Sequence, residues 1–119
     1  MGCSILLVED DGLSRSNIAR YFQNAGHFVH VAADGESAIE LISRMPFDVV
    51  VSDLQLPGLV NGIDVLIEQK RACPAGAVVL ITAFGAEEIK KQADSMGALY
   101  FEKPLWLPDL LEKVTQVCP

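Results

Sequence analysis

Asp53 is the residue of this sequence that is best placed to do chemistry. It closes an apolar run, Val49-Val50-Val51-Ser52, and the chain continues from it into a segment that contains Pro57-Gly58. A carboxylate at the end of a buried strand is held by a rigid scaffold and faces a loop, where binding and catalytic groups concentrate. Asp53 is therefore the first candidate for a metal ligand or a nucleophile.

Other polar residues stand at comparable places along the chain. Glu9, Asp10 and Asp11 follow the first apolar run, Thr82 ends another run, and Lys103 follows a further one. The carboxyl ends of parallel strands meet at one edge of a sheet, and open sheets bind their ligands there. The pattern predicts one pocket that holds several carboxylates, a hydroxyl and a cation.

The carboxylates of this pocket predict a metal site. Like charges repel, so carboxylates share a site only when they are protonated or bridged by a cation, and oxygen ligands without His or Cys favour Mg²⁺. Asp10 and Asp53 suit direct ligation, the backbone carbonyl of Gln55 can add a contact, and Glu9 can act through water. Asp11 is expected to cap the first helix, and it becomes a pocket residue instead if the first strand ends one residue later.

With such an ion beside it, Asp53 can attack phosphorus and form an aspartyl phosphate. Phosphoryl transfer needs its equatorial oxygens neutralised, and Lys103 and the Thr82 hydroxyl can serve the oxygens that the ion does not. Taken singly, a Thr after a strand is usually a helix cap and a Lys before Pro usually faces solvent. Their joint occurrence at strand ends favours the pocket.

The elements that must position these residues alternate between strand and helix patterns. Apolar runs at 3–8, 28–32, 47–52, 77–81 and 98–101 are separated or followed by stripes of helical period. This alternation predicts an α/β fold, a doubly wound five-stranded parallel sheet with five helices and strand order 2-1-3-4-5. The strand order reverses between the first and third strands, which end in Glu9-Asp10 and Asp53.

Composition limits the remaining possibilities. The chain has 119 residues, half of them hydrophobic, which predicts a single folded domain over 1–119, and its formal net charge of −7 argues against nucleic-acid binding by this domain. No apolar stretch reaches the roughly 18 residues of a membrane span. Cys3, Cys73 and Cys118 lie far apart and share no metal spacing with the histidines, so reduced thiols and a cytoplasmic location are expected.

Four motifs in the same order resemble the signature of the receiver domains of two-component response regulators. They are Leu6-Leu7-Val8-Glu9-Asp10-Asp11, Asp53-Leu54-Gln55-Leu56-Pro57-Gly58, Leu80-Ile81-Thr82-Ala83 and Lys103-Pro104. The resemblance covers essentially the whole chain and implies a flavodoxin-like fold. It also implies a cis Lys103-Pro104 peptide bond.

The resemblance implies a function as well. Asp53 would accept a phosphoryl group from a sensor histidine kinase or a phosphotransfer protein, with Mg²⁺ held by Glu9, Asp10 and Asp53. Thr82 and Tyr100 would form a switch pair that reshapes the surface of the fourth helix, fifth strand and fifth helix for an effector domain or protein. Such a domain is a switch and not an enzyme, beyond its own phosphotransfer and dephosphorylation, and phosphorylation can link it to homodimer formation.

Alternative functions fit less well. An aspartate-nucleophile phosphatase usually has a second Asp two residues after the nucleophile, where this chain has Gln55, and a nucleotide or flavin domain would need a glycine-rich phosphate loop. A receiver-like domain that only binds partners would not need the complete pocket. The segment before Gly62, the expected start of the third helix, is about one residue longer than the family's common form, within 59–61. The chain is either a stand-alone switch or, as we favour, part of a larger regulator.

Overall fold

The structure is a computed structural model that describes residues 2–119 and alternates five strands with five helices. Within this range no helix combines the length and the apolar character that crossing a membrane requires. The elements are β1 (Ser4–Val8), α1 (Gly12–Asn24), β2 (Phe28–Ala32), α2 (Gly35–Arg44), β3 (Val49–Asp53), α3 (Gly62–Ala72), β4 (Ala77–Thr82), α4 (Glu87–Ser95), β5 (Leu99–Glu102) and α5 (Leu107–Val117).

The sheet is parallel, with strand order β2-β1-β3-β4-β5. The predicted fold class and strand order are therefore confirmed. β1, β3 and β4 are central and almost wholly buried, which explains their uninterrupted apolar runs. β2 is an edge strand, and its exposed His30 is compatible with that place.

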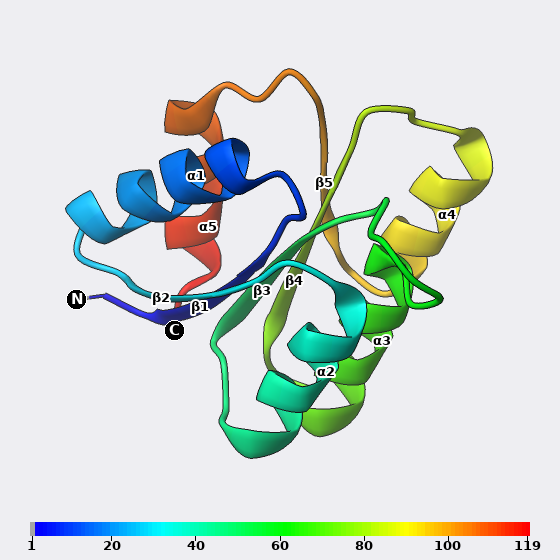
Figure 1. The fold of residues 1–119 in the computed structure, drawn as a ribbon, viewed down its shortest axis with the longest axis horizontal. Helices are drawn as coiled ribbons and strands as arrows, with labels where there is room; N and C mark the ends of the chain where they lie inside the picture. The colour runs from blue at the N-terminus through cyan, green and yellow to red at the C-terminus, as the bar shows by residue number, and fades with distance from the viewer. Residues whose placement is uncertain (1) are drawn as a thin grey trace.

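Two layers of helices cover the sheet, with α1 and α5 on one face and α2, α3 and α4 on the other (Figure 1). Successive strand residues point to opposite faces. Leu6 and Val50 consequently pack toward α2 and α3, whereas Leu7 and Val51 pack toward α1 and α5. Each such side chain stabilises the fold by about 1.5–3 kcal/mol when it is fully buried.

Local sequence signals explain where the helices begin. Asp11 and Asp34 accept hydrogen bonds from the backbone N–H groups three residues ahead, and Asn61 forms a reciprocal capping box with Asp64. Each cap is worth about 1 kcal/mol. α5 lacks a side-chain cap and instead carries Pro108 in its first turn, where the missing N–H needs no partner.

The β3–α3 loop is the segment predicted to be about one residue longer than usual. Gly58 has φ +89°, a conformation that favours glycine, and Leu59 is 97% exposed. Val60 packs against Gly35 at the start of α2, where a β-carbon would collide with it. Gly62 begins α3 as predicted, and its lack of a side chain lets the helix approach the Asp53 carbonyl oxygen. Leu59 therefore forms the solvent-facing tip of the loop.

A disulfide joins Cys3 to Cys118, so the expectation that all three cysteines are reduced was wrong for these two. The residues are 115 positions apart, but α5 returns the chain to the beginning of β1 and brings their Cα atoms within 5.9 Å. Sequence separation carries no information on this proximity. Cys73, at the end of α3, is a free thiol and is half-buried.

Candidate functional site

Backbone pairing brings the polar strand ends to one edge of the sheet. Ser52 is level with Val8, so Asp53 lies beside Glu9, the residue that follows β1. On the other side of β3, the Leu54 N–H donates to the Ile81 carbonyl at 2.7 Å and the Lys103 N–H donates to the Thr82 carbonyl at 2.9 Å. The strand register therefore brings four side chains together at this edge, those of Glu9, Asp53, Thr82 and Lys103.

Glu9, Asp10 and Asp53 form an acidic cluster whose ligand oxygens all lie within 4.8 Å of one another. Glu9 and Asp53 are buried, with 3% and 6% of their surface exposed, and Asp10 is exposed. Two buried carboxylates with a third at the entrance match the preference of Mg²⁺ for a few carboxylates together with water. The donor set therefore fits a hard divalent cation.

Lys103 extends from the end of β5 into this cluster. Its ammonium nitrogen lies 2.7 Å from Asp53 Oδ2 and 3.1 Å from Glu9 Oε1. Burial disfavours the charged amine, but the hydrogen bonds and charges of Asp53 and Glu9 outweigh this effect and raise the pKa of Lys103. Lys103 is thus held as a cation beside one oxygen of Asp53. The second oxygen, Oδ1, accepts the backbone N–H of Gln55 at 3.3 Å.

Glu9 lies in a site that disfavours its ionised form. Burial raises the pKa of Glu9, and the charge of Asp53 raises it further, against the lowering effect of hydrogen bonds from Lys103 and the Asp11 N–H. A nearby carboxylate and low exposure both disfavour the ionised form. A cation bound between these carboxylates would relieve both effects.

The loop after β1 is held by two residues outside the acidic cluster. Asp11 caps α1 by accepting the Ser14 N–H at 2.9 Å, so the favoured prediction for Asp11 is confirmed. The same hydrogen bond lowers the pKa of Asp11. Arg15 donates to the carbonyl oxygens of Glu9 at 2.9 Å and Asp10 at 3.4 Å. The sequence pattern did not predict this role of Arg15, whose only signal is its place one turn into the helix that follows the acidic residues.

Thr82 ends β4 as predicted and is fully buried. Its Oγ1 accepts the N–H of Phe84 and donates to the Phe84 carbonyl oxygen, both at 3.1 Å. The hydroxyl thus closes a tight turn at the start of the β4–α4 loop. Gln55 is exposed beside Asp53. Thr82 places a hydroxyl at this edge, and a movement of its side chain would alter the loop.

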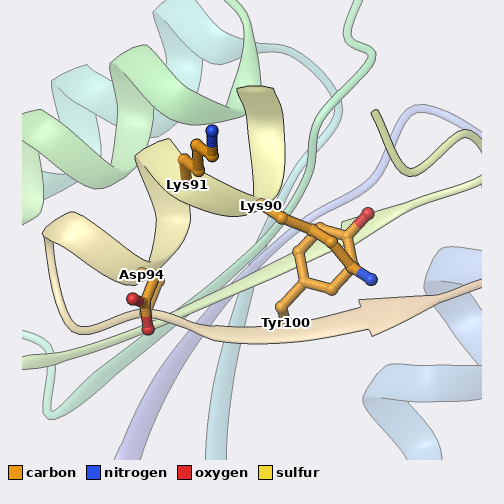
Figure 2. Close-up of a pocket in the computed structure, with 5 residues that line it drawn as sticks. Lys90, Lys91, Asp94 and Tyr100 are labelled. Atoms are coloured by element: carbon orange, nitrogen blue, oxygen red, sulfur yellow. The ribbon is translucent and has the colours of Figure 1, made fainter. Parts of the chain in front are cut away.

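Tyr100 lies on β5 beneath the same loop. Its hydroxyl is buried and has no hydrogen-bond partner within residues 2–119, and a β-carbon on Gly85 would collide with it. Burial raises the pKa of Tyr100, with further contributions from Glu102 and Glu87. A pocket of about 330 Å³ lies beside this ring. Lys90 lies over the Tyr100 ring, and its ammonium nitrogen is 5.7 Å from the ring centroid (Figure 2).

Comparison with known proteins places this arrangement in a family. The profile described as "Response regulator receiver domain" matches residues 5–115. The chain is a receiver domain. A solved receiver domain protein (CheY-like) from Methanospirillum hungatei JF-1 superimposes with a TM-score of 0.91 at 25% identity, covering 98% of this chain and 93% of that one. The predicted resemblance and the flavodoxin-like fold are confirmed.

Relatives of this receiver domain differ in length. Sporulation initiation phosphotransferase F of Bacillus subtilis is 28% identical over 120 residues, which cover all of this chain and 96% of that protein. The transcriptional activator protein PfeR of Pseudomonas aeruginosa is 38% identical over 107 residues, which cover 89% of this chain but only 34% of PfeR. The receiver domain therefore corresponds to an entire protein in one relative and to about a third of another.

The structure brings together the acidic cluster and Lys103, as the sequence predicted for this receiver domain. It leaves Tyr100 and Thr82 on adjacent strands, with Tyr100 beneath the loop that Thr82 begins. The Lys103–Pro104 peptide bond is cis, as predicted. Receiver domains as a family act in two-component signalling.

Proposed function

We propose that Asp53 is the phosphoryl acceptor of a two-component signalling switch. The observation that carries this proposal is the position of Asp53 at the centre of the site, with Lys103 at 2.7 Å from one oxygen and Glu9 and Asp10 beside it. A carboxylate oxygen attacks the phosphorus of a phosphohistidine or of an acyl phosphate. The new bond joins Asp53 to phosphorus, and the imidazole or carboxylate of the donor leaves.

The residues around Asp53 divide the charge of this transfer. Mg²⁺, held by Glu9, Asp10 and Asp53 with the backbone carbonyl of Gln55, would supply a positive charge to the phosphoryl oxygens. Lys103 keeps its proton in this site and would neutralise a second oxygen. The Thr82 hydroxyl, now used within its own turn, would donate to a third.

Thr82 and Tyr100 would carry the signal away from Asp53. A phosphoryl group adds about −1.5 to −2 charges and three acceptor oxygens, which attract the Thr82 hydroxyl. Movement of Thr82 would release the Phe84 N–H and change the loop that carries Gly85. The Tyr100 side chain already points inward, with its hydroxyl buried against Gly85. Phosphorylation would therefore stabilise or readjust an inward position that exists before the phosphoryl group is added.

Exposed apolar side chains support a protein partner at the acceptor. Four of them lie on α1 or on loops at the carboxyl edge of the sheet, namely Leu13, Leu59, Phe84 and Trp106 at 72% exposure or more. Exposed apolar residues grouped around a site mark protein contacts more often than isolated ones do. We assign this rim to a histidine kinase or phosphotransfer protein.

The receiver domain would act on an effector, either as a stand-alone protein or as one part of a larger regulator, and its relatives include both architectures. Sporulation initiation phosphotransferase F, 96% of which is matched, supports a stand-alone component. The transcriptional activator protein PfeR, 34% of which is matched, supports the receiver of a transcription regulator. We favour the larger regulator, with a homodimer as a further output form. Receiver domains are in general switches without a catalytic output of their own.

Incubation with acetyl phosphate and Mg²⁺, followed by intact mass measurement, tests the proposal. We expect the wild type to gain one phosphoryl group, and we expect Asp53→Asn or removal of Mg²⁺ to prevent the gain. Asp109→Asn, which removes an exposed carboxylate from the first turn of α5, is the matched control and should be phosphorylated normally. Phosphorylation of Asp53→Asn to the wild-type level would refute the assignment.

A further inference from the structure

His27 lies beside the disulfide between Cys3 and Cys118 and forms a cluster with these two cysteines. The Sγ atoms of the cysteines and a ring nitrogen of His27 lie within 4.8 Å of one another. Cys3 and His27 are buried, with 5% and 6% of their surface exposed, whereas Cys118 is half-buried. The cluster lies at the opposite edge of the sheet from Asp53, because Cys3 precedes β1 and the acceptor ends β3.

His27 is oriented toward the sulfur of Cys3 by two contacts. Its Nδ1 accepts the Cys3 backbone N–H at 3.2 Å and lies 3.7 Å from the Cys3 sulfur. Its Nε2 lies 3.2 Å from the Thr115 hydroxyl on α5. With Nδ1 accepting, Nε2 carries the proton and donates to Thr115. When Nδ1 takes up a second proton, the imidazolium stands 3.7 Å from the Cys3 sulfur and stabilises a departing thiolate, which makes that sulfur a better leaving group.

We propose that Cys3 and Cys118 form a reversible thiol–disulfide site that controls how firmly the end of α5 is attached to β1. Cys118 is more accessible than Cys3, so an external thiol attacks the Cys118 sulfur and Cys3 becomes the leaving group. A dithiol reductant reaches the half-buried Cys118 sulfur, while the buried Cys3 sulfur departs beside His27. In this arrangement His27 assists the reaction, and a disulfide with only a structural role would not require it.

A thiolate of the dithiol attacks the Cys118 sulfur, the bond between the two protein sulfurs breaks, and Cys3 leaves as a thiolate that takes up a proton. The second thiol of the reagent then attacks the mixed disulfide and releases Cys118 as a thiol. The protein gains two electrons and two protons, and the reagent becomes a cyclic disulfide.

Reduction would loosen one element of the fold. α5 is held to the sheet by Leu110 and Val114, which are fully buried, and at its end by the disulfide and the Thr115–His27 contact. A cross-link that closes most of the chain restricts the unfolded state strongly. We expect reduction to lower the Tm by about 10 °C or more. Amide exchange should rise most in the last turn of α5, while the buried strand β3 should exchange faster only to the extent that global stability is lost.

Counting thiols in the full chain tests the site directly. The protein is equilibrated with mixtures of reduced and oxidised dithiothreitol, denatured in an alkylating reagent and weighed. We expect one alkylated cysteine, Cys73, under oxidising conditions and three under reducing conditions, with a reversible transition between them. Three alkylated cysteines under all conditions, or one that no mixture changes in the folded protein, would overturn the proposal.

His27→Gln tests the part played by the imidazole. We expect reduction of the folded protein to slow by about tenfold, with Cys73→Ser as a control at the wild-type rate. Loss of stability alone would open the site and make reduction faster, so a slower rate cannot come from a folding defect. An unchanged or faster rate would overturn the role of His27. Stoichiometric zinc binding by the reduced protein that blocks reoxidation would identify a metal site instead.

Discussion

The ammonium nitrogen of Lys103 lies 2.7 Å from Oδ2 of Asp53 and so connects the end of β5 to that of β3 across the intervening strand β4. Because Lys103 also contacts Glu9, one cation balances two buried carboxylates. This contact stabilises the site when no ion is bound, and it places a positive charge where the proposed phosphoryl oxygens would arrive.

Replacement of Lys103 by Met should therefore destabilise the ion-free protein. Glu9 and Asp53 would remain buried without a counter-charge, which should lower the free energy of unfolding by about 1–3 kcal/mol near pH 7. Urea denaturation in a chelator measures the change, and Mg²⁺ should recover part of it. Lys91→Met, an exposed lysine on α4, is the matched control and should be neutral. Equal stability of the two variants would contradict a structural role for the bridge.

Asp10 should contribute to ion binding more than to folding, because its side chain is exposed and the other two carboxylates of the cluster are buried. We expect Asp10→Asn to weaken Mg²⁺ binding by about tenfold or more, while the stability measured in a chelator stays within about 0.5 kcal/mol of the wild type. Titration calorimetry gives the affinity. Asp94→Asn, on α4, removes a carboxylate elsewhere and should bind Mg²⁺ normally. A wild-type affinity in Asp10→Asn would exclude Asp10 as a ligand.

A side chain at Gly85 should disturb Tyr100. A β-carbon there would collide with the Tyr100 hydroxyl and would lie 3.0 Å from the Glu102 carboxyl carbon. We expect Gly85→Ala to lower the free energy of unfolding by about 1–3 kcal/mol. The loss should be smaller when Tyr100 is Phe, because the oxygen that collides is then absent.

A double-mutant cycle on Gly85→Ala and Tyr100→Phe isolates this contact, with an expected coupling of about 0.5–2 kcal/mol. Gly12→Ala is a suitable control, since a β-carbon there meets its nearest neighbour, Arg15, at an ordinary 3.7 Å. Strictly additive effects at Gly85 and Tyr100 would show that the hydroxyl does not occupy this position in solution.

Tyr100→Phe by itself should not destabilise the protein at neutral pH. The hydroxyl is buried without a partner among residues 2–119, so its removal should change the free energy of unfolding by about 0 to +1 kcal/mol. The pKa of Tyr100 is raised above 10, so the folded state retains the phenolic proton longer than the unfolded state does. This contribution to stability is present below pH 10 and is lost as the pH rises through the folded pKa.

Alkaline unfolding measures that effect. Wild-type stability should fall more steeply above pH 10 than that of Tyr100→Phe. Identical alkaline profiles for the wild type and Tyr100→Phe would contradict the burial of the hydroxyl.

The sequence predicted the strand order and the meeting of the acidic residues with Lys103 for the same reason. Each residue stands at the end of an apolar run, and parallel strands place such ends at one edge of the sheet. The position of Asp11 as a helix cap followed equally from local pattern.

Other features depend on packing between distant segments and had no local signal. The pairing of Cys3 with Cys118 requires that α5 return beside β1, and their separation of 115 positions indicates nothing about it. The contact of Tyr100 with Gly85 depends on the path of the β4–α4 loop, and the Arg15 hydrogen bonds depend on how α1 turns back over the acidic loop. Long-range contacts of this kind are decided by tertiary packing, which strand and helix periodicity do not report.

Chemical mapping of the phosphorylated residue distinguishes Asp53 from every other acceptor. An aspartyl phosphate is an activated acyl group that borohydride reduces to homoserine, so the acceptor can be located by peptide sequencing in a mass spectrometer. After treatment with acetyl phosphate and Mg²⁺, the account predicts homoserine at position 53 and at no other aspartate. Homoserine at position 10 or 11, or a phosphoryl group on a serine, threonine or histidine with Asp53 intact, would contradict it.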